Sequence, residues 1–194
     1  MTRAAVPGQP GQVSSQRIHT GRVINLDVDT VRFPDGSTGE LEIIRHPGAS
    51  AIVALAGDAT VSDPELVLIR QYRYAASGFI YEIPAGRLNP GESPGDCAAR
   101  ELAEETGYHA DHLAHLFTMF TTPGFTDEQI HVFLATDLHE GATAREADEF
   151  MSVERLPLSR ALALIRSGEI SDAKTALAIL HASRFGLAPE SNRL

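Results

Sequence analysis

Apolar and polar residues alternate through the first third of the chain. The segments RVINLDVDTVRF (22–33) and TGELEIIRH (38–46) show this alternation and are separated by PDGS, a typical turn sequence. They predict an antiparallel hairpin. The runs SAIVALAG (50–57) and ELVLIRQY (65–72) are more continuously apolar, which indicates two paired strands nearer the core. A further short strand is expected within FIYEIPAG (79–86).

The middle of the chain changes to a helical pattern and then returns to strands. Residues 94–107 are rich in Ala and Glu, and Gly107 stands where helices commonly end, so a helix is predicted here. Two strands are expected within LAHLFTMFTT (113–122) and QIHVFLATDL (129–138). PGFTDE (123–128) joins them, and its turn-forming residues predict a loop.

The last part of the chain predicts one strand and two helices. FMSVERLP (150–157) has strand character, whereas LSRALALIRSG (158–168) and SDAKTALAILHAS (171–183) carry apolar residues at helical spacing. Three helices interleaved with strands indicate a mixed α/β domain with helices on both faces of a sheet. The expected helix N-caps are Ser159 for the first of the two helices and Ser171 or Asp172 for the second.

Length and composition indicate one main domain with a small additional lobe. The chain has 194 residues, which suits one domain on the usual scale of about 100 to 200 residues. Residues 1–16 are rich in Pro, Gly, Gln and Ser and are expected to form a flexible tail. We assign the hairpin lobe to residues 17–48, the main α/β domain to 49–186 and a C-terminal tail to 187–194.

The charge balance excludes two classes of partner. The formal net charge is -10 and the isoelectric point is about 5.2, whereas binding to nucleic acid or to a membrane surface requires excess Lys and Arg. Neither partner is therefore expected. A polyanionic substrate would be held locally, by a few Arg side chains, backbone N–H groups or bound divalent cations.

Two features that the sequence lacks bear on the cellular compartment and on disulfide bonding. The N-terminus has no apolar stretch of signal-peptide length, and no run approaches about 18 apolar residues, so a cytoplasmic protein is expected. Cys97 is the only cysteine, so it has no partner in the chain for a disulfide. We expect it to be a small buried residue.

An acidic cluster lies within GRLNPGESPGDCAARELAEETGY (86–108). In a helix, Glu104 and Glu105 follow Glu101 by three and four positions, so the three carboxylates share one face. Like charges so close repel each other, and Mg²⁺ is a natural neutraliser because it prefers carboxylate and water oxygens. Glu92 joins this group if the preceding loop folds back, and Arg100 can pair with it. The alternative interpretation is a solvated acidic face with an incidental arginine.

The spacing of these residues resembles the Nudix box, GX₅EX₇REUXEEXGU, in which U is a bulky aliphatic residue. It matches at every fixed position and, through Leu102, at the first U. Tyr108 occupies the last U and departs from the pattern, which affects packing of the helix end more than chemistry. The resemblance implies a Nudix α/β/α sandwich around a mixed β-sheet. The residues given structural roles by the resemblance are Gly86, Glu92, Arg100 and Gly107.

The flanks of the box resemble the ADP-ribose pyrophosphatase branch of this superfamily. QYR and E-x-PAG precede the box, TTPGFTDEQIHVFLA follows it with Pro123 fifteen positions after Tyr108, and GEISDAKTALAIL lies near the end of the chain. The likeness covers residues from about 40 to 183. It implies hydrolysis of ADP-ribose to AMP and ribose 5-phosphate, and a homodimer in which the 17–48 hairpin lobe is exchanged.

The resemblance also implies a set of metal ligands and a general base. The metal is Mg²⁺, with Mn²⁺ as an alternative, and the general base is an acid within READEF (145–150). The implied metal ligands are the carbonyl of Ala85 and the carboxylates of Glu101, Glu104 and Glu105, of which Glu101 and Glu104 also belong to the catalytic set. The preferred base is Glu146, with Asp148 and Glu149 as alternatives.

Substrate contacts are implied in three places. Arg73, the arginine of QYR, corresponds to a residue that orients a phosphate, and its planar guanidinium suits that role. Glu42 and Gly124 are carried over as substrate-binding residues. Leu41 departs from relatives, which often have an arginine there, and this puts adenine recognition by the strand in question. Glu82 either faces the metal cluster or simply ends a strand.

Three alternatives to ADP-ribose hydrolysis remain open. The first is another nucleoside diphosphate sugar or a dinucleotide as substrate. The second is a Nudix module that senses nucleotides without turnover, although such modules usually lose acids of the box and none is missing here. The third is an acidic-helix interaction domain, which leaves Gly86, Arg100 and the PGF loop unexplained.

Overall fold

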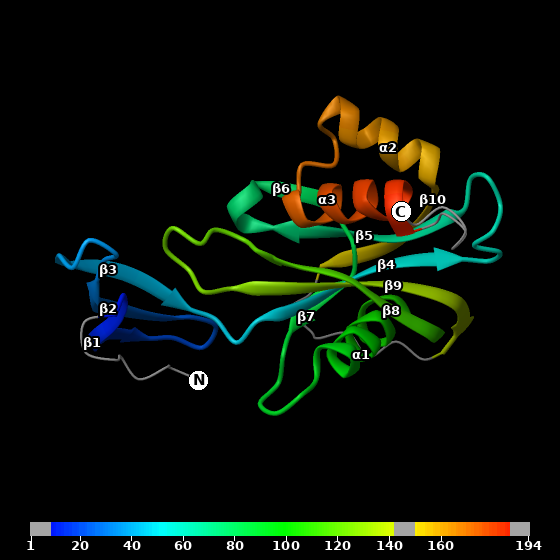
Figure 1. Cartoon of the computed structure of the whole chain (residues 1–194). Helices are drawn as coiled ribbons and strands as arrows, with labels where there is room; N and C mark the ends of the chain where they lie inside the picture. The colour runs from blue at the N-terminus through cyan, green and yellow to red at the C-terminus, as the bar shows by residue number, and fades with distance from the viewer. Residues whose placement is uncertain (1–8, 142–149, 187–194) are drawn as a thin grey trace. The chain divides into compact units, whose positions relative to one another are not determined.

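The computed structural model describes residues 9–141 and 150–186 (Figure 1). The chain divides into two compact units. Unit 1 comprises Met1–Gly48 and Phe120–Gln129, and unit 2 comprises Ala49–Met119 and Ile130–Leu194. Residues 120–129, which lie within the predicted 49–186 domain, group with the N-terminal strands in this division.

Unit 1 contains a three-stranded antiparallel sheet in the order β1-β2-β3. Its strands are β1 (Gly11–Thr20), β2 (Asn25–Arg32) and β3 (Thr38–Arg45). The predicted hairpin is present as β2 and β3. Strand β1 differs from the expected tail over residues 1–16, because its backbone pairs with β2 from Gly11 onwards. Backbone pairing needs few apolar side chains. Because the segment is mostly polar, its sequence did not predict a strand.

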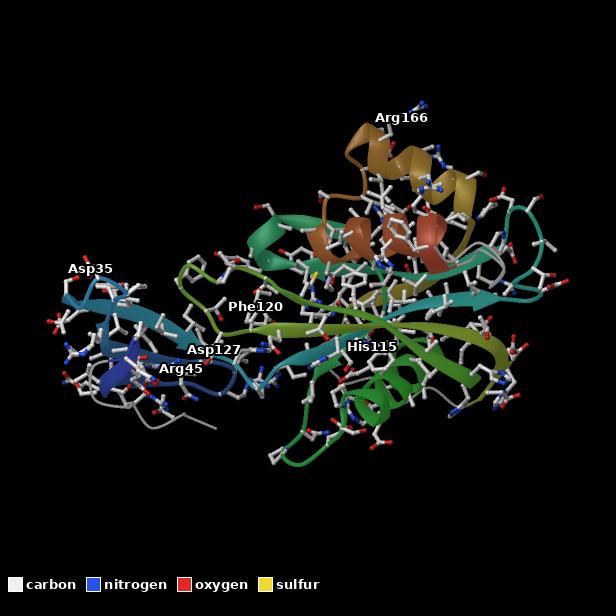
Figure 2. The ribbon with its side chains drawn as sticks, viewed as in Figure 1. Asp35, Arg45, His115, Phe120, Asp127 and Arg166 are labelled. Carbon is white, nitrogen blue, oxygen red and sulfur yellow. The ribbon has the colours of Figure 1, made fainter. Side chains whose placement is uncertain are left out.

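Buried aspartates hold unit 1 together. Asp27 and Asp29 on β2 are 6% and 4% exposed, and both form ion pairs with Arg45 on β3. Arg45 also bonds to Asp127 at 3.2 Å (Figure 2). In addition, the amide of Ile44 donates to the carbonyl of Phe125 at 2.8 Å. The 123–128 loop is thus bonded to β3 through both side chains and backbone.

Unit 2 is built on a seven-stranded mixed sheet in the order β10-β5-β4-β9-β8, with β6 paired to β5 and β7 paired to β4. Strands β4 and β9 are parallel, whereas the pairs β10–β5, β4–β5, β4–β7 and β5–β6 are antiparallel. The strand bounds are β4 (Ala49–Ala56), β5 (Glu65–Arg73), β6 (Gly78–Glu82), β7 (Ala85–Arg87), β8 (Tyr108–Phe120), β9 (Gln129–Glu140) and β10 (Met151–Pro157).

Helices cover both faces of this sheet (Figure 1). Helix α1 (Pro94–Thr106) lies on one face, and α2 (Leu158–Ser167) and α3 (Ala173–His181) lie on the other. Short 3₁₀ and π turns occur at Tyr74–Ala76 and Ala182–Gly186. The predicted mixed α/β architecture is confirmed.

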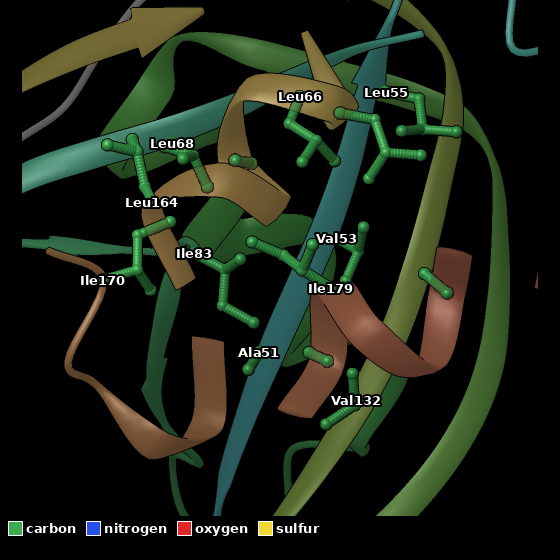
Figure 3. Close-up of a cluster of buried hydrophobic side chains, with 14 of the residues drawn as sticks. Ala51, Val53, Leu55, Leu66, Leu68, Ile83, Val132, Leu164, Ile170 and Ile179 are labelled. Atoms are coloured by element: carbon green, nitrogen blue, oxygen red, sulfur yellow. The ribbon is translucent and has the colours of Figure 1, made fainter. Parts of the chain in front are cut away.

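Strand β4 is buried throughout because its two faces pack against different helices. Val53 and Leu55 belong to the core beneath α2 and α3 (Figure 3), whereas Ile52 packs with Leu102 of α1. Tyr108, the aromatic residue at the last aliphatic position of the box, is partly buried against the α1 side of the core. It fills the packing role expected of that position.

The start of α2 corrects one expectation. Ser159 is not its N-cap, because the helix begins at Leu158 and Pro157 occupies the cap position. The amide and hydroxyl of Ser159 instead donate to the carboxylate of Asp63, at 2.8 and 2.7 Å. These two bonds also lower the pKa of Asp63. The cap is supplied by a residue far away in the sequence.

The other helix ends agree with the sequence. Asp172 caps α3 by accepting from the amide of Thr175, and Gly107 ends α1 in the left-handed region at φ 78°. Cys97 is buried, as expected. Within residues 9–141 and 150–186, no helix is long and apolar enough to cross a membrane.

Candidate active site

Helix α1 is fixed firmly at its start. Ser93 is the N-cap and accepts from the amide of Asp96, and Pro94 occupies the first turn, where no amide donor is needed. The hydroxyl of Ser50 on β4 donates to the carbonyl of Pro94 at 2.7 Å. The helix that carries the acidic face is therefore bonded directly to the central strand of the sheet.

Two carboxylates of α1 meet the backbone of β7. The amide of Ala85 donates to Oε2 of Glu105 at 3.0 Å, and Glu105 is only 3% exposed. A Cβ atom added to Gly86 would lie 1.9 Å from Oε1 of Glu101. Any side chain at position 86 would therefore displace the Glu101 carboxylate from its present place.

Arg100 gathers the remaining acids of the box. Its Nε and Nη2 donate to the two carboxylate oxygens of Glu92, at 2.8 and 2.9 Å. Its Nη1 donates to Glu101 at 2.6 Å and to Glu104 at 3.0 Å. Nη2 also reaches the carbonyl of Arg87 at 3.0 Å. One guanidinium therefore joins α1, the preceding loop and the end of β7, and the ion pair expected between Arg100 and Glu92 is present.

These contacts shift the pKa values of both partners so that the charged forms are favoured. The hydrogen bond from Arg100, with a second from the amide of Asn89, lowers the pKa of Glu92 from 4.5 to about 2. The same pairing raises the pKa of Arg100. Both groups remain charged across the physiological range, so the loop before α1 is held by a permanent ion pair.

The donor set suits a hard divalent cation. Among residues 9–141 and 150–186, no three His, Cys, Asp or Glu side chains are grouped closely enough to enclose a metal ion. Mg²⁺ does not require such an enclosure, since proteins commonly bind it through one or two carboxylates while it keeps several waters and contacts substrate phosphates. The carboxylates of Glu101 and Glu105, held against the backbone at Gly86 and Ala85, meet that description.

A second charged cluster lies at the end of β6. Glu82 is 1% exposed, and Arg73 of β5 binds it with two hydrogen bonds of 2.6 and 3.1 Å. Lys174 of α3 also bonds to Glu82, and it bonds to Asp172 at 2.9 Å. Burial alone would raise the pKa of Glu82, but the bonds from Arg73 and the charge of Lys174 lower it. Glu82 is therefore an ionised, fully paired carboxylate rather than a simple strand end.

The structure brings most of the predicted residues together but not all. Those near β7 and α1 are Ala85, Gly86, Glu92, Arg100, Glu101, Glu104 and Glu105. Glu42 is exposed on β3, and Gly124 lies in the loop between β8 and β9, so both belong to unit 1. Glu146, Asp148 and Glu149 lie outside the described residues.

Sequence reasoning missed Lys174. We treated its segment only as a helix with a capping residue, and nothing in the apolar spacing separates this position from its neighbours. One signal was available, because Lys174 is the only lysine of the chain and the other cationic side chains are all arginines.

Comparison with known proteins identifies the family. A family model described as the NUDIX domain matches residues 45–176. An ADP-ribose pyrophosphatase of Bacillus subtilis (strain 168) is 42% identical over 169 residues, which covers 86% of this chain and 89% of the relative. A methanol dehydrogenase activator of Bacillus methanolicus is 41% identical with the same coverage.

Two further matches extend these findings. An ADP-ribose pyrophosphatase of Mycobacterium tuberculosis is 37% identical over 183 residues, covering 91% of this chain and 85% of the relative. The crystal structure of an ADP compounds hydrolase superposes with a TM-score of 0.76, covering 91% of this chain and 94% of that one. Its sequence identity is 22%, so this likeness concerns the fold alone.

The Glu92–Arg100 pair gives a prediction about stability and pH. Because folding lowers the pKa of Glu92 from 4.5 to about 2, its stabilising effect is complete above pH 4.5 and is lost as the pH falls towards 2. Glu92→Gln should lower the free energy of unfolding at pH 7 by about 1 kcal/mol, since the site is partly solvated.

Urea unfolding at pH 7, 4 and 3 measures this difference. The gap between the variant and the natural protein should shrink across that range. Glu140→Gln, at an exposed glutamate of β9, is the control and should change little at any pH. A gap that stays constant from pH 7 to pH 3 would contradict the assigned ion pair.

Proposed function

Because this chain belongs to the Nudix family of pyrophosphohydrolases, we propose that it is a Mg²⁺-dependent enzyme that hydrolyses ADP-ribose to AMP and ribose 5-phosphate. The observation that carries the proposal is the placement of Glu101 and Glu105 against the backbone of β7. The choice of ADP-ribose is supported by the names of two relatives that are 42% and 37% identical over most of the chain.

Residues at the α1–β7 contact would hold the metal. Glu101, Glu105 and the carbonyl of Ala85 are the proposed ligands of Mg²⁺ or Mn²⁺. Glu104, whose side chain is 41% exposed, is proposed as a further ligand or as a group that acts through a metal-bound water. When bound, the metal would neutralise charge on the diphosphate and lower the pKa of an attacking water. Arg100 keeps the acids in place by holding Glu101 and Glu104 along with the loop.

Arg73 is the proposed contact to a phosphate. Its side chain is 43% exposed although its partner Glu82 is buried, so the guanidinium lies between the interior and the solvent. Its bonds to Glu82 raise the pKa of Arg73, which therefore stays cationic. Two remaining roles rest on the family resemblance. Glu146 would take the proton of the attacking water, and Glu42 and Gly124 would contact the rest of the substrate.

The test is a substrate panel. The protein is incubated with Mg²⁺ and ADP-ribose, other nucleotide sugars or dinucleotides, and products are identified by chromatography and ³¹P NMR. ADP-ribose should give the highest kcat/KM and yield AMP with ribose 5-phosphate, and a chelator should abolish turnover. A higher kcat/KM for another nucleotide sugar or a dinucleotide would replace the proposed substrate. Absence of any turnover would contradict the enzyme assignment.

Gly86 offers a sharp test of the metal site. In Gly86→Ala the new methyl group would occupy the position of the Glu101 carboxylate, so the carboxylate must move. The turnover number should fall by about a hundredfold, as expected when a catalytic group is displaced by roughly an ångström. Glu101→Gln should show a similar or greater loss.

The matched control is Gly95→Ala, at a glycine in the first turn of α1 where an added Cβ has no atom nearer than 4.0 Å. It should retain near-normal turnover. Circular dichroism verifies that all three variants are folded. Normal turnover in Gly86→Ala would show that Glu101 is not held at the reacting centre as proposed.

The N-terminal unit is proposed to form a homodimer. Several of its large apolar side chains are exposed, and contact with a second copy of the chain would bury them. They are Val13, Ile18, Val23, Ile24 and Leu41. Light scattering should give twice the chain mass of 20.9 kDa, and Ile18→Asp should shift it towards one chain. Val61→Asp, at an exposed position of unit 2, is the control. If light scattering of the unsubstituted protein gives the mass of one chain, the proposed dimer is wrong.

A further inference from the structure

The only lysine of the chain lies in an unusual place. Lys174 is in the first turn of α3, and its side chain is 14% exposed. A lysine is rarely so enclosed unless its charge is paired. The Nudix box does not include it, and it lies 92 residues away in sequence from Glu82, the carboxylate that it contacts.

Lys174 shares Glu82 with Arg73. The carboxylate of Glu82 is buried, and both cations bond to it, Arg73 through its Nε and Nη2 and Lys174 through its ammonium. Asp172 balances the second positive charge, since its Oδ2 accepts from Lys174 at 2.9 Å. Two cations and two anions therefore form a group with no net charge.

Loss of Lys174 would change the state of Arg73. Glu82 would keep a single cationic partner, and the group would carry one net negative charge close to Glu105, whose charge already acts on Arg73. Removing one partner from a buried ion pair leaves buried charge uncompensated, so the attraction of Glu82 would act on Arg73 alone. The guanidinium would then be less available to an anionic substrate, and the local potential would repel it.

The same helical turn also holds the backbone before the proposed metal site. The amide of Ile83 donates to the hydroxyl of Thr175 at 2.9 Å, and that hydroxyl donates to Asp172 at 2.6 Å. Ile83 lies two residues before Ala85. The first turn of α3 therefore has two separate connections to this segment, one to the side chain of Glu82 and one to the backbone.

We propose that Lys174 is a positioning residue, which shares the charge of Glu82 and so keeps the Arg73 guanidinium in place for the substrate diphosphate. The inference rests on the proposed function as a diphosphate hydrolase but not on ADP-ribose as the substrate. A lysine suits the position because its compact ammonium has three donors and reaches both Glu82 and Asp172.

Kinetics test the proposal on whichever diphosphate the natural protein hydrolyses fastest. Lys174→Met should raise KM by about tenfold to a hundredfold and leave kcat within about twofold, because binding is affected and the metal ligands are not. Lys174→Arg should restore part of the loss. Arg166→Met removes one positive charge from an exposed position on α2 and should leave KM unchanged (Figure 2).

A double mutant separates positioning from a general loss of stability. If Lys174 acts through Arg73, then Lys174→Met should add little to the KM of Arg73→Met. Thr175→Val, which removes the bond to Ile83 but keeps Lys174, should lower kcat more than it raises KM. An unchanged KM in Lys174→Met, or an increase that persists in full beside Arg73→Met, would overturn the proposal.

A spectroscopic measurement tests the proposal on the unsubstituted protein, so it does not depend on whether a variant folds. Protein labelled with ¹⁵N-lysine has one side-chain ammonium resonance, because the chain has one lysine. This resonance should shift when Mg²⁺ and the methylene-bridged analogue of ADP-ribose are added. Broadening of the analogue's ³¹P signals with an unmoved lysine resonance would overturn the role of Lys174. Absence of broadening would contradict ADP-ribose as the substrate instead, and the kinetic comparison then decides the role of Lys174.

Discussion

Repulsion between carboxylates is the constraint that shapes this protein, and Arg100 is the side chain that overcomes it. Glu92, Glu101 and Glu104 all bond to its guanidinium. Without a cation here, Glu101 and Glu104 of α1 would repel each other and would also repel Glu92, so the loop that carries Glu92 would tend to move away from the helix. The same guanidinium reaches the backbone of β7 at Arg87, so the charge pairing also fixes where the helix meets the sheet.

The segment from Glu82 to Gly86 is where the two sides of the unit meet. From one side, Glu105 of α1 accepts a hydrogen bond from the amide of Ala85, and the Glu101 carboxylate lies beside Gly86. From the other side, α3 bonds to Glu82 and Ile83. Because β4 packs tightly on both faces, the two helices are held at a fixed spacing around this segment. The proposed metal ligands and the proposed phosphate contact are therefore supported by separate helices.

Much of the local structure was predictable because its causes are local. The alternation in β2 and β3, the apolar run of β4 and the caps of α1 and α3 all arise from residues close in sequence. Two predictions failed, one because the partner is 96 residues away in the sequence and one because the pairing is through backbone. The cap of α2 is provided by Asp63, and β1 exists because its backbone pairs with β2. Asp63 and β2 stabilise the start of α2 and strand β1, but neither interaction requires a periodic pattern of apolar residues in the segment that it stabilises.

The family and the chemistry of the box follow from the sequence, because three acids spaced by three and four positions must share a helical face and their spacing from Gly86 and Arg100 is specific. Only the tertiary structure shows that the Glu101 carboxylate lies where a side chain at position 86 would be, and that Arg73 and the only lysine share Glu82. These contacts join residues up to 92 positions apart. They depend on how α1 and α3 pack on opposite faces of one sheet, which no local period encodes.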